Sequence, residues 1–101
     1  MSRKHGGAAN DDPRVASRLE EAKQRIARVT KRRRGELGLT QEEMSEDLGC
    51  STAYYQRVEY GHVNVSLRFL AHLTVVLDVD LEEMLRAGRL LRSRTSKKAA
   101  N

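Results

Sequence analysis

The stretch Leu39-Thr-Gln-Glu-Glu-Met-Ser-Glu-Asp-Leu-Gly-Cys-Ser-Thr-Ala-Tyr-Tyr-Gln-Arg-Val-Glu-Tyr-Gly61 decides the fold of this chain of 101 residues. Thr40 with Glu43 three residues later is the pattern of a capping box, which begins a helix. Gly49 can adopt the positive φ that ends this helix and turns the chain. Ser51 would cap a second helix, and the glycine that closes the stretch is placed to end it. The stretch therefore predicts two short helices joined by a tight corner.

Apolar residues on each predicted helix lie three or four positions apart, as they do on the buried face of an amphipathic helix. Met44 and Leu48 share one face of the first helix, and Tyr55 and Val58 share one face of the second. Cys50 is small and apolar enough to be buried at the corner. Packing of these two faces would hold the helices at a fixed angle.

The outward side of the second helix carries polar groups near its N-terminus. A helix, a glycine corner and a second helix with an exposed polar N-terminus form a helix-turn-helix motif. Short polar or methyl side chains and an arginine fork are the groups that reach base edges in the major groove. The sequence therefore predicts double-stranded DNA binding, with base contacts from Thr52, Ala53, Gln56 and Arg57.

Composition narrows the class of partner. Nineteen Lys and Arg residues against 14 Asp and Glu residues give a net charge of +5, which favours a polyanionic partner. Three tyrosines, one phenylalanine and no tryptophan argue against single-strand binding by base stacking. A single cysteine excludes an intramolecular disulfide and fits a reducing cytoplasm.

No catalytic, metal or membrane pattern stands out in the sequence. The three histidines have no metal-ligand spacing to each other or to Cys50, and the acidic residues between 42 and 47 lack a neighbouring histidine or nucleophile. The first residues lack the apolar core of a signal peptide, and the longest apolar run is too short to span a membrane. We expect a cytoplasmic protein that is not an enzyme and that has no cofactor, metal ion, small-molecule ligand or membrane partner.

A long helix is expected before the motif. Residues 1–12 contain almost no large apolar side chains and should form a disordered arm. Asp12-Pro13 is a typical helix start, and Gly35 should end the helix. The apolar residues lie three or four apart, at Val15, Leu19, Ala22, Ile26 and Val29. Either this stripe packs on its own domain, or its first half pairs with a second chain; three heptads would support a dimer but are short for an independent coiled coil.

The densest basic run is Lys31 to Arg34. Lys31 and Arg32 would contact phosphates of the duplex, or they are solvated cations at a helix end, where they suit the helix dipole. Further candidate phosphate contacts flank the second motif helix, with packed or solvated side chains as the alternative. They are Ser51, Tyr54, His62 and Asn64.

Two more helices are expected after the motif. Ser66 would cap a largely buried helix, whose apolar or small residues are Leu67, Leu70, Ala71, Leu73, Thr74 and Leu77. Asp80 and Glu83 would form a capping box for a last helix, with Leu81, Met84 and Leu85 facing inward.

The sequence thus predicts an all-α domain of five helices over residues 13–91, with the motif at 40–61. Residues 92–101 are basic and poor in apolar side chains, so they should form a mobile tail.

Three segments of the chain resemble a known family, the phage-repressor and Cro-like helix-turn-helix regulators, also called xenobiotic-response-element regulators. The resemblance covers about residues 26–86 and is specific through the combination of its motifs. These are Gly38-Leu-Thr-Gln-Glu-Glu-Met44, Leu48-Gly-Cys-Ser51 and Arg57-Val-Glu-Tyr-Gly61.

The resemblance implies a lambda-repressor-like DNA-binding domain that regulates transcription as a homodimer on a palindromic operator. It implies that Gln41 contacts a phosphate and braces the second motif helix, and that Arg34 and Glu59 form a structural ion pair. The chain departs from the family where Thr30 and Arg33 stand at positions that are usually aliphatic. Either the first helix rotates, or Leu37, expected to turn into the core with Leu39, fills the missing volume.

Some alternatives stay open at this stage. The dimer would use the N-terminal stripe, or the C-terminal helix through Met84 and Leu85. The small size and the segment from Asn64 to Leu67 also resemble the controller proteins of restriction–modification systems. The rival function is an antitoxin-type module, which neutralises a protein partner and binds DNA secondarily.

Overall fold

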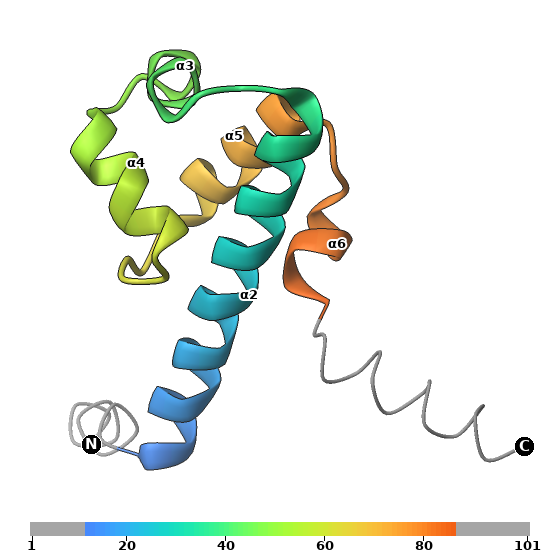
Figure 1. Cartoon of the computed structure of the whole chain (residues 1–101). Helices are drawn as coiled ribbons and strands as arrows, with labels where there is room; N and C mark the ends of the chain where they lie inside the picture. The colour runs from blue at the N-terminus through green and yellow to red at the C-terminus, as the bar shows by residue number, and fades with distance from the viewer. Residues whose placement is uncertain (1–11, 87–101) are drawn as a thin grey trace, which may run out of the picture.

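Five α-helices make up the part of the chain that the structure, a computed structural model, describes, which is residues 12–86 (Figure 1). They are α2 (Pro13–Leu37), α3 (Gln41–Leu48), α4 (Thr52–Glu59), α5 (Leu67–Leu77) and α6 (Leu81–Leu85). No strand occurs in this range, which confirms the all-α prediction. None of these helices is long and apolar enough to cross a membrane. The predicted N-terminal arm and basic tail lie outside the described residues.

Helix α2 begins as predicted but ends later. The Asp12 carboxylate accepts a hydrogen bond from the Arg14 backbone N–H at 2.8 Å and caps the N-terminus. The helix runs through Gly35 and ends at Leu37, because Gly38 adopts the left-handed conformation, with φ 70°. An isolated glycine costs a helix only about 1 kcal/mol, whereas the left-handed position strongly favours glycine. The prediction that Gly35 ends the helix was wrong.

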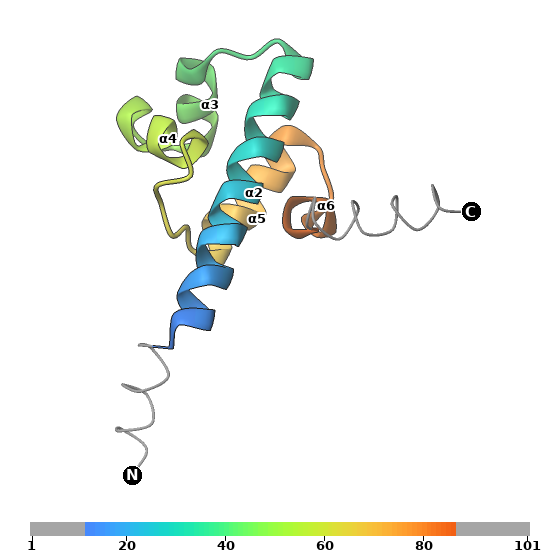
Figure 2. The ribbon, with the colours of Figure 1, turned by 60° about the horizontal axis from the view of Figure 1, so that its bottom comes forward.

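Only the second half of α2 is covered by the rest of the domain. Ile26 and Val29 are buried, but Val15 is 50% exposed and Leu19 is 40% exposed. Residues 13–20 are all exposed, and this part of α2 extends past the other helices in both views (Figures 1 and 2). The C-terminal part of the predicted apolar stripe therefore packs on its own domain. The N-terminal part packs on no other helix of the described chain.

The two atypical positions of α2 still face the core. Thr30 is fully buried, and its hydroxyl has no hydrogen-bond partner among the described residues. Arg33 is half-buried, and its Nε donates to the Leu77 carbonyl at 2.8 Å, at the end of α5. Leu37 is 39% exposed, so it does not fill core volume. The expectation that Leu37 compensates was wrong, and the half-buried Arg33 instead satisfies a carbonyl at the end of α5.

The two motif helices have the predicted caps. Thr40 and Glu43 form the reciprocal capping box, with hydrogen bonds of 3.0 and 2.8 Å. Gly49 ends α3 with φ 71°, and the Ser51 hydroxyl accepts the Tyr54 backbone N–H at 3.0 Å. The corner between α3 and α4 is therefore set by local hydrogen bonds.

The last two helices differ from prediction in what they bury. Ser66 caps α5 as predicted, but Leu67 at the start of α5 is 73% exposed and Ala71 is also exposed. In α6, Met84 is buried, whereas Leu81 and Leu85 are 43% and 41% exposed. The prediction that these leucines face inward was wrong, because the described chain supplies partners for only one side of each helix.

The predicted capping box at α6 does not form. Asp80 is the N-cap residue, but its side chain makes no capping hydrogen bond. The Glu83 carboxylate instead accepts a hydrogen bond from Arg32 at 3.0 Å. A charged partner on α2 thus outcompetes the local backbone N–H, because charge-assisted hydrogen bonds are the stronger ones.

One core joins all five helices. Tyr55, Met44, Leu73, Leu77 and Met84 are fully buried within it. Helix α2 lies in the middle, with α4 on one side and α6 on the other, as both views show (Figures 1 and 2). The fold thereby presents two separate surfaces, one on α3 and α4 and one between α2 and α6.

Candidate nucleic-acid interface

The start of α4 is fastened to α3. The Cys50 backbone N–H donates to the Ser45 carbonyl at 3.0 Å, and the hydroxyls of Ser45 and Thr52 are 3.1 Å apart. Ser45 is buried and Cys50 is half-buried against the core, where burial raises the pKa of the Cys50 thiol. These contacts fix the N-terminus of α4 at the surface.

The end of α4 is held by one buried carboxylate. Glu59 is 6% exposed, and it accepts hydrogen bonds from Arg34 of α2, from the Tyr55 hydroxyl and, at 3.0 Å, from the Gln41 amide of α3. Arg34 also donates to the Leu39 carbonyl at 2.9 Å. A single side chain therefore ties three helices together, which fixes the orientation of α4.

The environment keeps Glu59 ionised. Burial alone would raise the pKa of its carboxyl, but hydrogen bonds from Arg34, Tyr55 and Gln41 outweigh burial and hold that pKa below its ordinary value. The pairing with Glu59 in turn raises the pKa of Arg34. Burial and the nearby carboxylate raise the pKa of Tyr55, so the phenol stays a hydrogen-bond donor. The cluster is a buried, hydrogen-bonded ion pair at the edge of an apolar core.

Two glutamine side chains connect the Glu59 cluster to the surface. The Gln56 amide nitrogen donates to the Gln41 side-chain oxygen at 3.0 Å, and Gln41 in turn donates to Glu59. Both glutamines are half-buried. Their orientation is therefore set before any partner arrives, which lowers the entropy cost of using them in binding.

A free face remains on α4. Ala53 and Arg57 are exposed and four residues apart, and Tyr60, three residues further on, is 61% exposed. The Arg57 side chain has no hydrogen-bond or ion-pair partner in the described range. These three residues form a strip on the side of α4 turned away from the core.

Tyr60 was missed in the sequence analysis. Its ring centroid lies 5.9 Å from that of His62. The spacing of three residues from Arg57 was the available signal, since positions i and i+3 share a helix face.

The other predicted contact residues fall into two groups. Thr52 and Gln56 are half-buried and hydrogen-bonded within the motif, and Tyr54 is half-buried with its ring edge against Phe69, at 5.4 Å between centroids. Ser51, His62 and Asn64 are exposed near the two ends of α4. The structure thus brings both groups together with Gln41, Ala53 and Arg57 around one helix.

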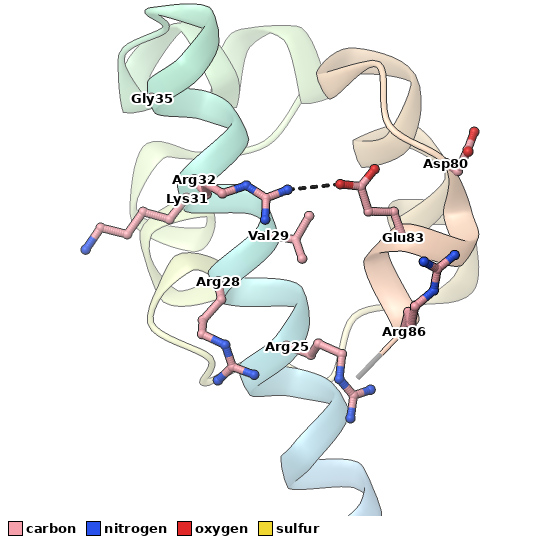
Figure 3. Close-up of a pocket in the computed structure, with 9 residues that line it drawn as sticks. All are labelled: Arg25, Arg28, Val29, Lys31, Arg32, Gly35, Asp80, Glu83 and Arg86. Carbon is pink, nitrogen blue, oxygen red and sulfur yellow. Dashed lines mark hydrogen bonds and ion pairs between the residues drawn. The ribbon is translucent and has the colours of Figure 1, made fainter. Parts of the chain in front are cut away.

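Lys31 and Arg32 lie elsewhere. Arg32 pairs with Glu83 of α6. Lys31 and Arg32 both line the space between α2 and α6 (Figure 3). The structure does not bring them together with the free face of α4.

Two short helices, the second held by the buried hydrogen bonds of Glu59 and presenting an exposed strip, define a helix-turn-helix DNA-binding domain. The family comparison agrees, since the model of the helix-turn-helix domain family matches residues 25–87, more than half of the chain. The chain belongs to this family, which makes it a DNA-binding regulator. No curated protein matches it closely enough to add a relative.

Proposed function

We propose that the protein is a sequence-specific regulator of transcription that binds double-stranded DNA as a homodimer. Helix α4 enters the major groove of each half-site of a palindromic operator, with half-site centres about 34 Å apart. Within the helix-turn-helix family this is the Cro/C1-type mode of action, and a controller protein of a restriction–modification system would act in the same way.

The observation that carries the proposal is the unpaired Arg57 on a braced helix. The polar side chains of α4 that face α3 or the core, Thr52, Gln56 and Glu59, have hydrogen-bond partners, whereas the exposed Arg57 has none in the described range. An arginine presented in this way makes bidentate hydrogen bonds to guanine. Ala53, one turn earlier, would contact a thymine methyl group.

The flanking groups fit contacts to the sugar-phosphate backbone. Ser51, His62 and Asn64 are exposed at the ends of α4, and Gln41 lies at the start of α3, where the positive end of the helix dipole favours an anion. Such contacts set the register of the protein on the duplex without carrying sequence information.

The dimer contact is proposed to use the uncovered start of α2. Val15 and Leu19 belong to the same apolar stripe as Ile26 and Val29, which are buried in the core. A helix segment of this length that packs on nothing is only marginally stable without a partner. Ile26 and Met84 are excluded from any interface because they are buried in their own domain.

Selection of bound sequences from a random double-stranded DNA pool tests the proposal. The expected result is an enriched site with two inverted halves, each containing a G·C pair whose replacement weakens binding. Enrichment of a site without inverted symmetry would overturn the homodimer, and no enrichment over random DNA would overturn sequence-specific binding.

A further inference from the structure

The groove between α2 and α6 is a second charged surface, on the opposite side of α2 from α4 (Figures 1 and 3). Its volume is about 920 Å³. Five of its nine lining residues are arginines or a lysine, two are acidic, and Val29 forms an apolar part of its wall. The groove therefore carries an excess of positive charge over a small area.

Some of these cations hold the fold together. Arg25 donates to the Leu85 carbonyl at 2.7 Å and closes the end of α6. Arg32 spans the groove to Glu83, as Figure 3 shows, with 3.0 Å between nitrogen and oxygen. Both side chains help to hold α6 against α2, and each also has an acidic partner, Glu21 for Arg25 and Glu83 for Arg32.

Two other cations of the groove make no contact that holds the described helices together. Arg28 and Lys31 are exposed, and neither side chain has a hydrogen-bond or ion-pair partner among residues 12–86. Both extend from α2 at the rim of the groove, with Lys31 directed away from α6 (Figure 3). Gly35, one turn further on, adds no side chain, so a ligand can approach the helix backbone there. The rim is therefore open to an anionic partner.

The mixed charges favour a protein over a nucleic acid. The Asp80 carboxylate also lines the groove, and it caps no backbone group. A nucleic-acid backbone is uniformly negative and would be repelled there. An acidic protein segment can place its carboxylates at the free cations and a backbone N–H, which donates a hydrogen bond, at Asp80. A duplex bound by α4 would lie on the other side of α2, so it leaves the groove free.

We propose that the α2–α6 groove binds an acidic segment of another protein, with Arg28 and Lys31 as the contacting cations. This inference does not rest on the proposed operator binding. The two surfaces would let one molecule hold DNA and a protein partner together.

Fluorescence anisotropy with a labelled acidic peptide tests the proposal without DNA. The probe is a peptide of about 12 residues made of glutamate, aspartate and leucine, and its control has glutamine and asparagine in place of the acids. The wild-type protein should bind the acidic peptide and not the neutral one, with an affinity that falls as salt rises. Equal binding of both peptides, or no binding of either, would overturn the proposal.

A matched pair of charge reversals locates the site. Arg28→Glu should weaken peptide binding about tenfold or more, whereas Arg68→Glu, the same change at an exposed arginine of α5, should have little effect. Equal losses in both variants would mean that only net charge matters, and the groove would not be the site.

Random duplex DNA is the second probe for the same variants. Arg57→Ala, outside the groove, should keep the peptide affinity. Arg28→Glu should lower the affinity for random duplex no more than Arg68→Glu does, because both changes reverse one exposed charge. A loss of duplex binding in Arg28→Glu well beyond that in Arg68→Glu would make the groove a nucleic-acid surface and overturn the assignment to a protein.

Discussion

Glu59 is the residue that connects the two motif helices to α2. It accepts from side chains of α2, α3 and α4, and it is nearly fully buried. A buried carboxylate is costly unless it is fully paired. Its role is therefore to make one arrangement of the three helices much better than any other.

Two arginines on α2 allow a controlled test of this role. Arg34→Met leaves the Glu59 charge buried without its cation and should lower the free energy of unfolding by about 3 kcal/mol. Arg32→Met removes exposed pairs to Glu36 and Glu83 and should cost less than about 1 kcal/mol. Urea denaturation measures both, and equal losses would contradict the structural role of Arg34.

The lowered pKa of Glu59 predicts a pH dependence. Its stabilising contribution is present above the ordinary pKa near 4.5 and is lost as pH falls through the lowered value in the folded state. The stability advantage of the wild type over Glu59→Gln should therefore shrink between about pH 7 and about pH 3. Denaturation curves of both proteins at several pH values measure it, and an advantage that is constant or grows in acid would contradict the assignment.

Local residue patterns were predictable and contacts between distant residues were not. The Thr40–Glu43 box and the caps at Ser51 and Ser66 depend on residues three positions apart. The expected box at Asp80 and Glu83 failed because Arg32, 51 residues away from Glu83, competes for that carboxylate. The hydrogen bond from Gln56 to Gln41 likewise joins distant positions of the chain, and no local pattern predicts it.

At the level of the helices, two glycines near the end of α2 have opposite roles. Gly35 is helical with no atom within 4 Å of an added Cβ, whereas Gly38 has φ +70°. Gly35→Ala should stabilise the protein by about 1 kcal/mol. Gly38→Ala should destabilise it by about 1–2 kcal/mol, because an L side chain is strained there. Thermal unfolding distinguishes them, and a loss of stability in Gly35→Ala would contradict the helix boundary.

Helix existence was predictable from periodicity, but helix burial was not. The stripe on α5 predicted the right helix, yet Leu67 is 73% exposed and Ala71 is also exposed. Periodicity shows which residues share a face, and it does not show how much of that face the other helices can reach. The same limit explains the exposed Leu81 and Leu85 of α6.

For the molecule as a whole, we propose that two copies pair through the uncovered start of α2. Leu19→Asp places a charge in the proposed interface, so the proposed homodimer should dissociate to monomers without loss of helix content. Leu85→Asp, an equal change at an equally exposed leucine of α6, should leave the dimer intact. Sedimentation equilibrium reports the mass, and dissociation by Leu85→Asp alone would move the interface to α6.

The described helices are arranged around α2, with α4 on one side and α6 on the other (Figure 2). The net charge of +5 draws the protein to any duplex. Discrimination between duplexes must come from side chains that are free to bond to bases, and we propose that Arg57 is the main one.

The most direct test is the ratio of affinities for the selected operator and for random DNA, measured by gel shift for the wild type, Arg57→Ala and Arg68→Ala. If Arg57 bonds to a base, Arg57→Ala should lower this ratio by about 10-fold or more, equivalent to about 1–3 kcal/mol of lost discrimination per arginine–guanine contact. Arg68→Ala should keep the ratio, and both variants should keep the fold by circular dichroism. An unchanged ratio in a folded Arg57→Ala protein would contradict the claim that α4 selects the operator through Arg57.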